Sequence, residues 1–515
     1  MRILFVTSNG TGLGHLTRSM AIARRLEGEV EPLFFTLSAA APVVRELGFP
    51  VEYAASYATP GAGNDWRWSR RLRGRLRAAI AEAEPSVLVF DGTHPYEALL
   101  GAMRSFDGMR TVWSRRPLWR EGSSRVPLGR TGSFDAVLEP GELAAAEDRG
   151  PTVARRTEAH AVAPIVLLDR SELLPREEAA RELGLDPAAT NVLVGLGQGS
   201  EVAATTDRCL RHLAGREGIQ VAALSSALAG LGASPEGIAQ LRATYPISRY
   251  YAAFDAAVSA SGYNAYHELI ALGVPSLFVP MSRETDDQPA RARFAAAGGL
   301  GWAVEGPDDP GLERALDRLA DDEARGAVAA RLSEHELSNG AVEAAGWLAG
   351  LAAGRPAGGG DVAAGPKGSA LGAWARRWRT FFASAPATAL RLGRQIATQP
   401  RPRTLLFALG LRGDELERGV SEALARTPDP PPKVLVVTDS LELGRLRALG
   451  VGVEHVPAPG ERQPELAGGE YDGFLRRRLA LILAERPRPR RVLLAPGSRP
   501  APDALDLEAT ASRSG

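Results

Sequence analysis

A turn between two apolar runs of the sequence has the features needed to hold an anion. The run 256–259 is followed by Ser261-Gly262, by a helix predicted over 264–272, and by a second apolar run, 274–280, which is too short for a helix. In such a strand–helix–strand unit, ligands bind beyond the carboxyl ends of the strands, where free N–H groups at the helix N-terminus attract negative charge. The pattern therefore predicts a phosphate site at this turn.

Polar side chains close to the turn can bind hydroxyl groups. Asn264 opens the predicted helix, and Glu268 follows about one helical turn later. Asp287 and Gln288 come after the second apolar run. A diphosphate at the helix end, with hydroxyls near these side chains, makes a nucleotide sugar the ligand that fits. Taken alone, the same stretch also fits an ordinary unit of any doubly wound α/β domain.

A glycine-rich loop lies between a predicted strand, 3–6, and a predicted helix, 16–26. Gly12 and Gly14 can adopt backbone conformations closed to other residues and leave room for a ligand. The G-x-G-x-G spacing, with no acidic residue closing the next strand, favours a sugar-nucleotide site over a dinucleotide site. His15 can take a proton from an acceptor hydroxyl at neutral pH, or it can simply cap the loop.

Asp91 comes directly after another predicted strand, 87–90. Because the carboxyl ends of parallel strands meet at one edge of a sheet, we expect Asp91 to lie near His15. In that position its carboxylate can orient or polarise the histidine. The alternative role for an aspartate after a strand is to cap the N-terminus of the next helix.

These segments resemble GT-B glycosyltransferases, and they are most similar to the group that contains the N-acetylglucosaminyltransferase of peptidoglycan synthesis and related family 28 type UDP-sugar transferases. The N-terminal loop carries that group's G-x-G-H-x-x-R motif in residues 12–18. A second glycine loop, 195–199, resembles the G-G-S-Q-G loop that opens the donor-binding domain. The other matching residues are Ser261, Gly262, Glu268, Gly273, Pro275, Phe278, Val279, Pro280 and Gln288.

The resemblance implies roles for the candidate residues. It implies that His15 is the catalytic base, assisted by Asp91, and that Glu268 takes the ribose hydroxyls. It also implies that Asp287 and Gln288 face the donor sugar, although the closest group has a second glutamine where this chain has Asp287. The donor phosphates are expected to contact the second glycine loop, at Gly197, Gln198 and Gly199. Gly197 replaces a serine of the family, so backbone N–H groups must supply more of that contact.

Composition limits the class of protein. The chain has 515 residues, which is too long for one core, and its 61 Lys+Arg balance its 61 Asp+Glu, which gives no reason to expect nucleic acid as a partner. A single cysteine, Cys209, excludes an internal disulfide and a cysteine-rich metal site. No stretch reaches the roughly 18 apolar residues of a membrane helix, and the apolar start is too short for a signal peptide. We expect a cytoplasmic protein, attached at most to the inner surface of the cell membrane.

The sequence predicts an α/β fold with two facing Rossmann-like domains and a C-terminal small α/β module. A Gly-, Ala- and Pro-rich stretch indicates a linker before that module, in which predicted strands and helices alternate. The expected divisions are an acceptor-side domain (1–163), a donor-binding domain (164–351), a linker with a basic, aromatic-rich helix (352–402), the accessory module (403–497) and a disordered tail (498–515).

Basic segments that also carry aromatic residues indicate a membrane or acceptor surface. The first holds Trp66, Arg67, Trp68, Arg70 and Arg71, and it continues in the same style to Arg77. A second mixture of Arg and Trp lies at 113–130, and a third basic, aromatic-rich segment at 374–394. The alternatives are a solvated cationic face for the first segment and a helix docked on another domain for the third.

The combined prediction is an inverting glycosyltransferase that moves an N-acetylhexosamine or a hexose from a UDP-sugar to a hydroxyl of a lipid-linked or polysaccharide acceptor of the cell envelope. No cofactor is expected, and no metal, because no Asp-x-Asp follows a predicted strand. Helix N-termini would stabilise the leaving diphosphate instead. The competing possibilities are a UDP-sugar hydrolase or epimerase on the same fold and a scaffold protein that binds nucleotide sugars without chemistry.

Overall fold

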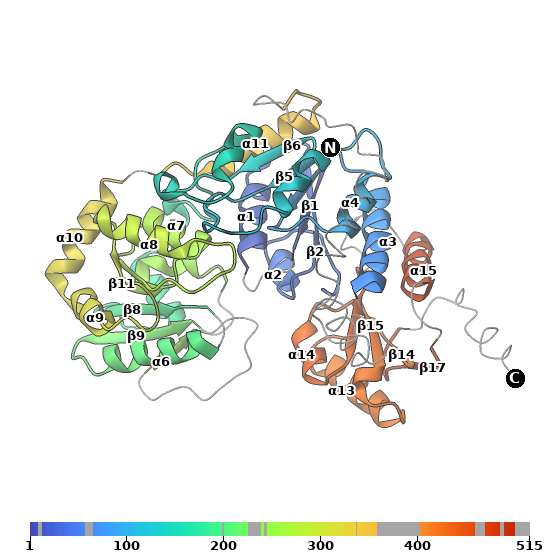
Figure 1. Ribbon diagram of the computed structural model, residues 1–515. Coiled ribbons are helices and arrows are strands. Elements are labelled where there is room, and N and C mark those ends of the chain that lie inside the picture. Colours follow the sequence, from blue (N-terminus) through green and yellow to red (C-terminus); the bar gives the residue numbers. More distant parts are fainter. Residues whose placement is uncertain are drawn as a thin grey trace, which may run out of the picture.

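The computed structural model of the chain contains three parallel β-sheets with helices packed around them (Figure 1). It describes residues 1–8, 13–56, 65–197, 200–224, 238–241, 245–335, 337–357, 402–458, 469–484 and 489–499. Several predicted features lie outside the described residues, namely Gly12, Gln198, Gly199 and the basic segment 374–394.

The first sheet has seven parallel strands in the order β3-β2-β1-β4-β5-β6-β7. Its central strands are buried on both faces, which explains their continuous apolar runs. The strand order reverses between β1 and β4, so the ligand crevice of this domain lies at the carboxyl ends of those two strands. The strands are β1 (Arg2–Thr7), β2 (Glu31–Thr36), β3 (Val51–Tyr53), β4 (Val87–Asp91), β5 (Arg110–Ser114), β6 (Ala136–Glu139) and β7 (Ala159–Ala161). The helices are α1 (Gly14–Ala23), α2 (Ala41–Glu46), α3 (Asp65–Ala83) and α4 (Glu97–Met103), with 3₁₀ turns η1 (Pro127–Ser133), η2 (Ala145–Glu147) and η3 (Val153–Glu158).

The second sheet has six strands in the order β10-β9-β8-β11-β12-β13, again all parallel. Its order reverses between β8 and β11, which places a second crevice beside the Ser261-Gly262 turn. The strands are β8 (Thr190–Gly195), β9 (Ile219–Leu224), β10 (Ile238–Leu241), β11 (Ala256–Ser259), β12 (Ser276–Phe278) and β13 (Trp302–Ala303). The helices are α5 (Arg176–Leu183), α6 (Ser200–Ala214), α7 (Tyr263–Leu272), α8 (Gln288–Ala297), α9 (Leu312–Ala320), α10 (Asp322–Ser333) and α11 (Gly340–Ala352), with 3₁₀ turns η4 (Arg170–Glu172) and η5 (Ile247–Ala253).

The third sheet is smaller and has the strand order β16-β15-β14-β17, as in one half of a doubly wound fold. This arrangement confirms the predicted two Rossmann-like domains followed by a small α/β module. The strands are β14 (Thr404–Ala408), β15 (Val434–Thr438), β16 (Gly452–His455) and β17 (Arg491–Leu494). The helices are α13 (Gly413–Ala425), α14 (Leu443–Ala448) and α15 (Gly469–Ala484), with the 3₁₀ turn η6 (Pro431–Lys433).

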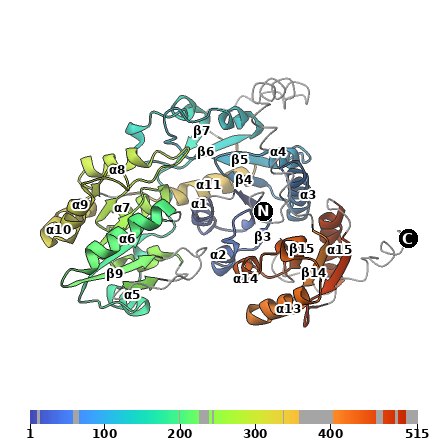
Figure 2. The ribbon, with the colours of Figure 1, turned by 60° about the horizontal axis from the view of Figure 1, so that its bottom comes forward.

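The first domain lies in the middle of the molecule, with the second domain and the third module on opposite sides of it (Figure 2). The chain returns to the first domain through α11, whose buried Ala341, Ala344 and Leu348 join the same apolar core as α1. That core continues into the third module, through residues such as Leu443 and Val453. The third module is therefore packed onto the first domain through a shared core.

The arginine-rich segment forms α3, and packing explains much of its composition. Leu72, Leu76 and Ile80 bury one face of the helix, and the indole N–H of Trp68 donates a 2.8 Å hydrogen bond to the Ala55 carbonyl. Arg70 is exposed, Arg67 and Arg71 are half-buried, and the side chain of Trp66 lies outside the described part of the chain. Within the described residues, none of the helices combines the length and the apolar character that crossing a membrane requires. A membrane or acceptor role for this helix stays a prediction.

A buried ion network joins α3 to the third module. Arg75 Nη1 donates to Glu454 Oε2 at 2.7 Å, and Arg75 Nη2 donates to Glu52 Oε1 at 3.0 Å. Arg478, on α15, donates to the other oxygen of Glu52 at 2.7 Å. All four side chains are buried, so each charge depends on its partners rather than on water. Burial acts to lower the pKa of Arg75, but the two carboxylates outweigh it and raise that pKa.

Candidate functional site

Two neighbouring strands of the first domain bring His15 and Asp91 together. Thr7 at the end of β1 pairs in register with Asp91 at the end of β4, and α1 begins shortly after β1. His15 Nδ1 lies 2.6 Å from Asp91 Oδ1. Arg18, one turn along α1, donates to both oxygens of Asp91 at 2.5 and 3.2 Å. The ends of β1 and β4 thus hold the contact that the sequence predicted.

The charges around His15 fit a base. Burial acts to raise the pKa of Asp91, but Arg18 and His15 outweigh it and lower that pKa, so Asp91 is ionised. A carboxylate only accepts hydrogen bonds, so His15 carries its hydrogen on Nδ1 and keeps its lone pair on Nε2. Burial lowers the pKa of His15, and the positive charges of Arg18 and Arg116 add to this, against the influence of Asp91. The imidazole is therefore neutral at neutral pH and able to accept a proton.

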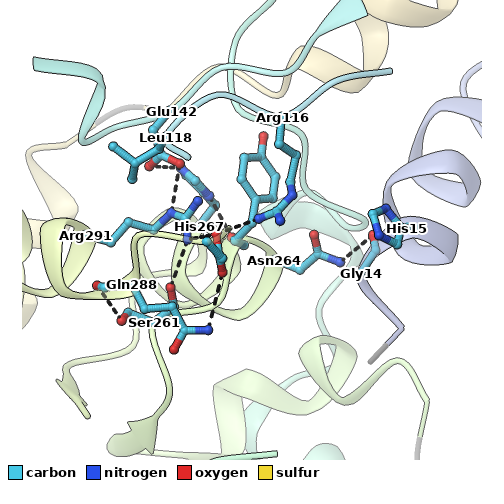
Figure 3. Close-up of polar contacts among 12 residues, drawn as sticks. Gly14, His15, Arg116, Leu118, Glu142, Ser261, Asn264, His267, Gln288 and Arg291 are labelled. Carbon is cyan, nitrogen blue, oxygen red and sulfur yellow. Dashed lines mark hydrogen bonds and ion pairs between the residues drawn. The ribbon is translucent and has the colours of Figure 1, made fainter. Parts of the chain in front are cut away.

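The Ser261-Gly262 turn lies at the start of α7 in the second domain, opposite α1. Gly262 is the N-cap, and no side chain caps the first N–H groups of α7, which leaves them available to an anion. The Ser261 hydroxyl donates to the Gln288 carbonyl at 2.8 Å. Asn264 Nδ2 donates to the Gly14 carbonyl at 3.2 Å, so α7 of one domain touches the start of α1 of the other (Figure 3).

One carboxylate oxygen and one side-chain amide oxygen on α7 have no hydrogen-bond partner among the described residues. They are Glu268 Oε1 and Asn264 Oδ1. The two residues are four apart, so their side chains share one face of the helix. The Glu268 side chain is buried, with the residue 7% exposed, and burial raises its pKa to about 7, against the influence of the Leu167 amide. Unsatisfied buried acceptors need donors, and ligand hydroxyls are such donors.

If Glu268 binds the ribose hydroxyls of UDP, as the resemblance implies, the affinity for UDP should increase with pH through about 7, because hydroxyls donate better to an ionised carboxylate than to a neutral one. The pKa of Glu268 is raised to about 7, so its carboxyl is mostly protonated below that pH and ionised above it. Calorimetry should show about tenfold tighter UDP binding at about pH 8 than at about pH 6. Glu268→Gln should bind UDP more weakly and lose this increase, and it also controls for the ionisation of UDP itself. An equal increase in the variant would contradict the role of Glu268.

The side chains of Asp287 and Gln288 already form hydrogen bonds with other residues of the protein. Asp287 Oδ1 accepts the Ala290 N–H at 3.1 Å and so caps α8. Gln288 Oε1 accepts the Met281 N–H at 2.9 Å, and its Nε2 donates to Asp286 Oδ2 at 3.3 Å. The second hydrogen of Nε2 has no such partner among these contacts, so a donor remains for a sugar hydroxyl. Contact of either residue with the donor sugar stays a prediction.

Gly197 follows β8, and the Ser261-Gly262 turn follows the neighbouring strand, β11. The strand before it, β8, pairs with β11 in register, Gly195 opposite Ser259. Gly197 is exposed and has a φ of 96°, which a residue with a side chain rarely adopts. The glycine that replaces the family's serine therefore suits this backbone conformation. Its contact with phosphate stays a prediction, since the following residues of the loop lie outside the described chain.

The basic mixture at 113–130 is exposed only in part. Arg120 and Arg125 are exposed, whereas other members of the segment are buried or paired, and an acceptor role for the segment stays a prediction. Trp113, Arg115 and Trp119 are buried. Trp113 stacks in the first domain's core, where its indole N–H donates to the Gly92 carbonyl at 2.8 Å. Arg116 crosses to the second domain and donates to Asp286 Oδ1 at 2.7 Å. Composition alone favoured a surface because it does not show which basic residues have buried partners.

A buried charge cluster that was not predicted lies between the two domains. Arg291 of α8 donates to Asp286 Oδ1 and to Glu142 Oε2, each at 2.8 Å, and His267 Nε2 lies 3.2 Å from Glu142 Oε1 (Figure 3). Glu142 comes from the first domain, and burial would raise its pKa, but Arg291 and His267 lower it to about 2. Glu142, His267 and the pair of Asp286 and Arg291 come from three separate segments of the chain and follow no motif, so their spacing gave no sign of the cluster.

The chain is similar in sequence to known enzymes. No protein-family model matches it. The UDP-N-acetylglucosamine–N-acetylmuramyl-(pentapeptide) pyrophosphoryl-undecaprenol N-acetylglucosamine transferase of Burkholderia lata is 27% identical over 336 residues, which cover 60% of this chain and 84% of that enzyme. The enzyme of the same name from Rhodococcus opacus is 27% identical over 338 residues, with 59% and 83% covered. The chain is a homologue of these N-acetylglucosaminyltransferases.

Among solved structures, Acinetobacter baumannii MurG is similar at 15% identity and a TM-score of 0.45, over 67% of this chain and 99% of that one. The two sequence relatives confirm the predicted resemblance to N-acetylglucosaminyltransferases. The roles of single residues stay predictions. In the part of the chain that the structure describes, no three His, Cys, Asp or Glu side chains are placed to hold a metal ion.

Proposed function

We propose that this chain transfers a sugar, N-acetylglucosamine in the first instance, from a UDP-sugar to a hydroxyl of a lipid-linked or other cell-envelope acceptor. The observation that carries the proposal is the placement of the His15–Asp91 pair beside the start of α7, with Asn264 touching Gly14. On that helix, Glu268 offers an unsatisfied acceptor. The printed names of the relatives supply UDP-N-acetylglucosamine and an undecaprenol-linked acceptor as the first pair to test.

The proposed reaction is a single displacement with inversion. His15 Nε2 takes the proton of the acceptor hydroxyl while its oxygen forms a bond to the anomeric carbon. The bond from that carbon to the diphosphate oxygen breaks, and UDP leaves with the electron pair. The N–H groups at the start of α7 are aimed at the phosphates and stabilise the charge that develops there. Asp91 holds the imidazolium that forms.

Turnover of UDP-N-acetylglucosamine with and without a lipid-linked acceptor tests this function. A transferase releases UDP in step with glycosylated acceptor and yields little product without acceptor. Rapid release of free sugar without acceptor would indicate a hydrolase, and conversion to another UDP-sugar would indicate an epimerase. Binding of UDP with no turnover under either condition would indicate a scaffold protein. Each of these three outcomes would overturn the proposal.

Transfer is expected to continue in the presence of a chelator. The positive ends of helices, rather than a bound cation, are proposed to stabilise the leaving diphosphate. The initial rate of UDP release should therefore change by less than about twofold when excess EDTA is added, and magnesium should not increase it. Complete loss of turnover in EDTA, with recovery on addition of magnesium, would contradict a metal-independent reaction.

A further inference from the structure

The loop that carries Asp287 and Gln288 is held by the first domain along its length. The segment after β5 runs antiparallel to this loop, with a bridge between Trp119 and Asp286. The Arg120 N–H donates to the Thr285 carbonyl at 2.9 Å, and the Asp287 N–H donates to the Leu118 carbonyl at 3.2 Å. The conformation of this second-domain loop therefore depends on the first domain.

The first-domain side of this contact is itself firmly held. Leu118 has a φ of 58°, a left-handed conformation that is strained for a residue with a side chain. The buried carboxylate of Asp148 accepts the Leu118 N–H at 3.1 Å and the Gly150 N–H at 2.9 Å. A Cβ at Gly150 would lie 1.7 Å from the Trp119 carbonyl oxygen, so only glycine fits there. The surrounding structure thus maintains a strained segment at the domain contact.

Asp286 links this contact to Gln288. Its Oδ1 accepts from Arg116 of the first domain at 2.7 Å and from Arg291 at 2.8 Å, and its Oδ2 accepts from Gln288 Nε2. The Met281 N–H needs an acceptor, so the amide oxygen of Gln288 must face it. The Asp286 carboxylate needs a donor, so the amide nitrogen of Gln288 must face that side. The two partners therefore fix which way the amide points, and one N–H remains to be presented to a ligand.

We propose that Arg116 and Asp286 are positioning residues that orient the Gln288 amide toward the donor sugar, so that sugar recognition is complete only when the first domain is docked on this loop. The inference rests on the proposed function, because Gln288 can contact a donor sugar only in a chain that binds a UDP-sugar. Arg116 acts through Asp286 and does not itself touch the donor. A charge-assisted hydrogen bond supplied by one domain would in this way set the sugar affinity of the other.

Arg116→Gln is the test variant, and Arg120→Gln is its matched control. Arg120 is an exposed arginine of the same contact that donates to the Arg283 carbonyl at 3.2 Å, away from Asp286. Calorimetry with UDP and with UDP-N-acetylglucosamine should show that Arg116→Gln leaves the affinity for UDP unchanged and weakens the affinity for the UDP-sugar about tenfold. The KM for the UDP-sugar should increase similarly, with a smaller change in kcat. Arg120→Gln should match the wild type, and Arg116→Lys should recover part of the loss.

The double variant Arg116→Gln/Gln288→Ala separates positioning from general loosening of the domain contact. If Arg116 acts through Gln288, the double variant binds the UDP-sugar no more weakly than Gln288→Ala alone. Additive losses, or an equal loss of UDP affinity in Arg116→Gln, would overturn the inference. Unchanged UDP-sugar affinity in Arg116→Gln would also overturn it while leaving the proposed function intact. A wild-type chain that binds neither UDP nor UDP-N-acetylglucosamine would overturn the proposed function and this inference together.

Discussion

Replacing His15 with alanine is expected to lower turnover by about a hundredfold or more, the usual loss when a general base is removed. The affinity for UDP should remain within about twofold of the wild type, because the nucleotide is proposed to contact α7 rather than His15. The lone pair on His15 Nε2 is the group lost, while Asp91 keeps its ion pair with Arg18. Single-turnover transfer to acceptor and calorimetry with UDP measure the two quantities separately.

His212→Ala is the control for this variant. His212 lies on α6 and contacts Asp317 on α9, so it is a histidine with a carboxylate partner that does not belong to the proposed site. Its variant should keep wild-type turnover. Wild-type turnover in His15→Ala would remove the assignment of His15 as the base. A fall in UDP affinity as large as the fall in turnover would instead assign His15 to donor binding.

Replacing Arg75 with methionine is expected to cost about 3–5 kcal/mol in the free energy of unfolding, the range found when one partner of a buried ion pair is removed. Glu454 and Glu52 would each lose a buried hydrogen-bond donor from Arg75. In a folding unit of this size, such a loss lowers the unfolding temperature by about 6 °C or more. Differential scanning calorimetry should show the shift in the transition of the first domain and third module, which share one core.

Arg77→Met is the matched control for this experiment. Arg77 is exposed on the same helix, so its replacement should change the unfolding temperature by little. The transition of the second domain should stay in place in both variants, because Arg75 makes its ion pairs within the first domain and with the third module. Equal transitions in Arg75→Met and wild type would contradict a stabilising role for the buried network.

The fold could be predicted because periodicity and turn residues act locally. β11 has the bounds expected from its apolar run, and α7 ends at Leu272, where Gly273 caps it in the left-handed conformation that favours glycine. The return of α11 to the first domain could not be predicted in this way. Its apolar face shows that it is buried but does not show against which core. The docking of the third module on α3 could not be predicted either, because the charged residues that join them, such as Glu52 and Glu454, are 402 residues apart.

The site was predictable where one motif holds several functional residues. His15 lies in α1, shortly after β1, and Asp91 ends β4; both follow apolar runs, and parallel strands bring their carboxyl ends together. The charges between the domains gave no such signal. Arg116, Asp286 and Glu142 come from three separate loops, and their burial depends on how two domains dock. Composition therefore assigned Arg116 to a basic surface, whereas the structure pairs it with Asp286 of the other domain.

A crystal structure of the chain with UDP tests the central claim most directly, that the nucleotide binds at the start of α7 opposite His15. The predicted result places the diphosphate against the backbone N–H groups that follow Gly262, with the ribose hydroxyls within hydrogen-bond distance of Glu268. UDP bound elsewhere on the chain, or bound there with Glu268 turned away from the ribose, would contradict that claim.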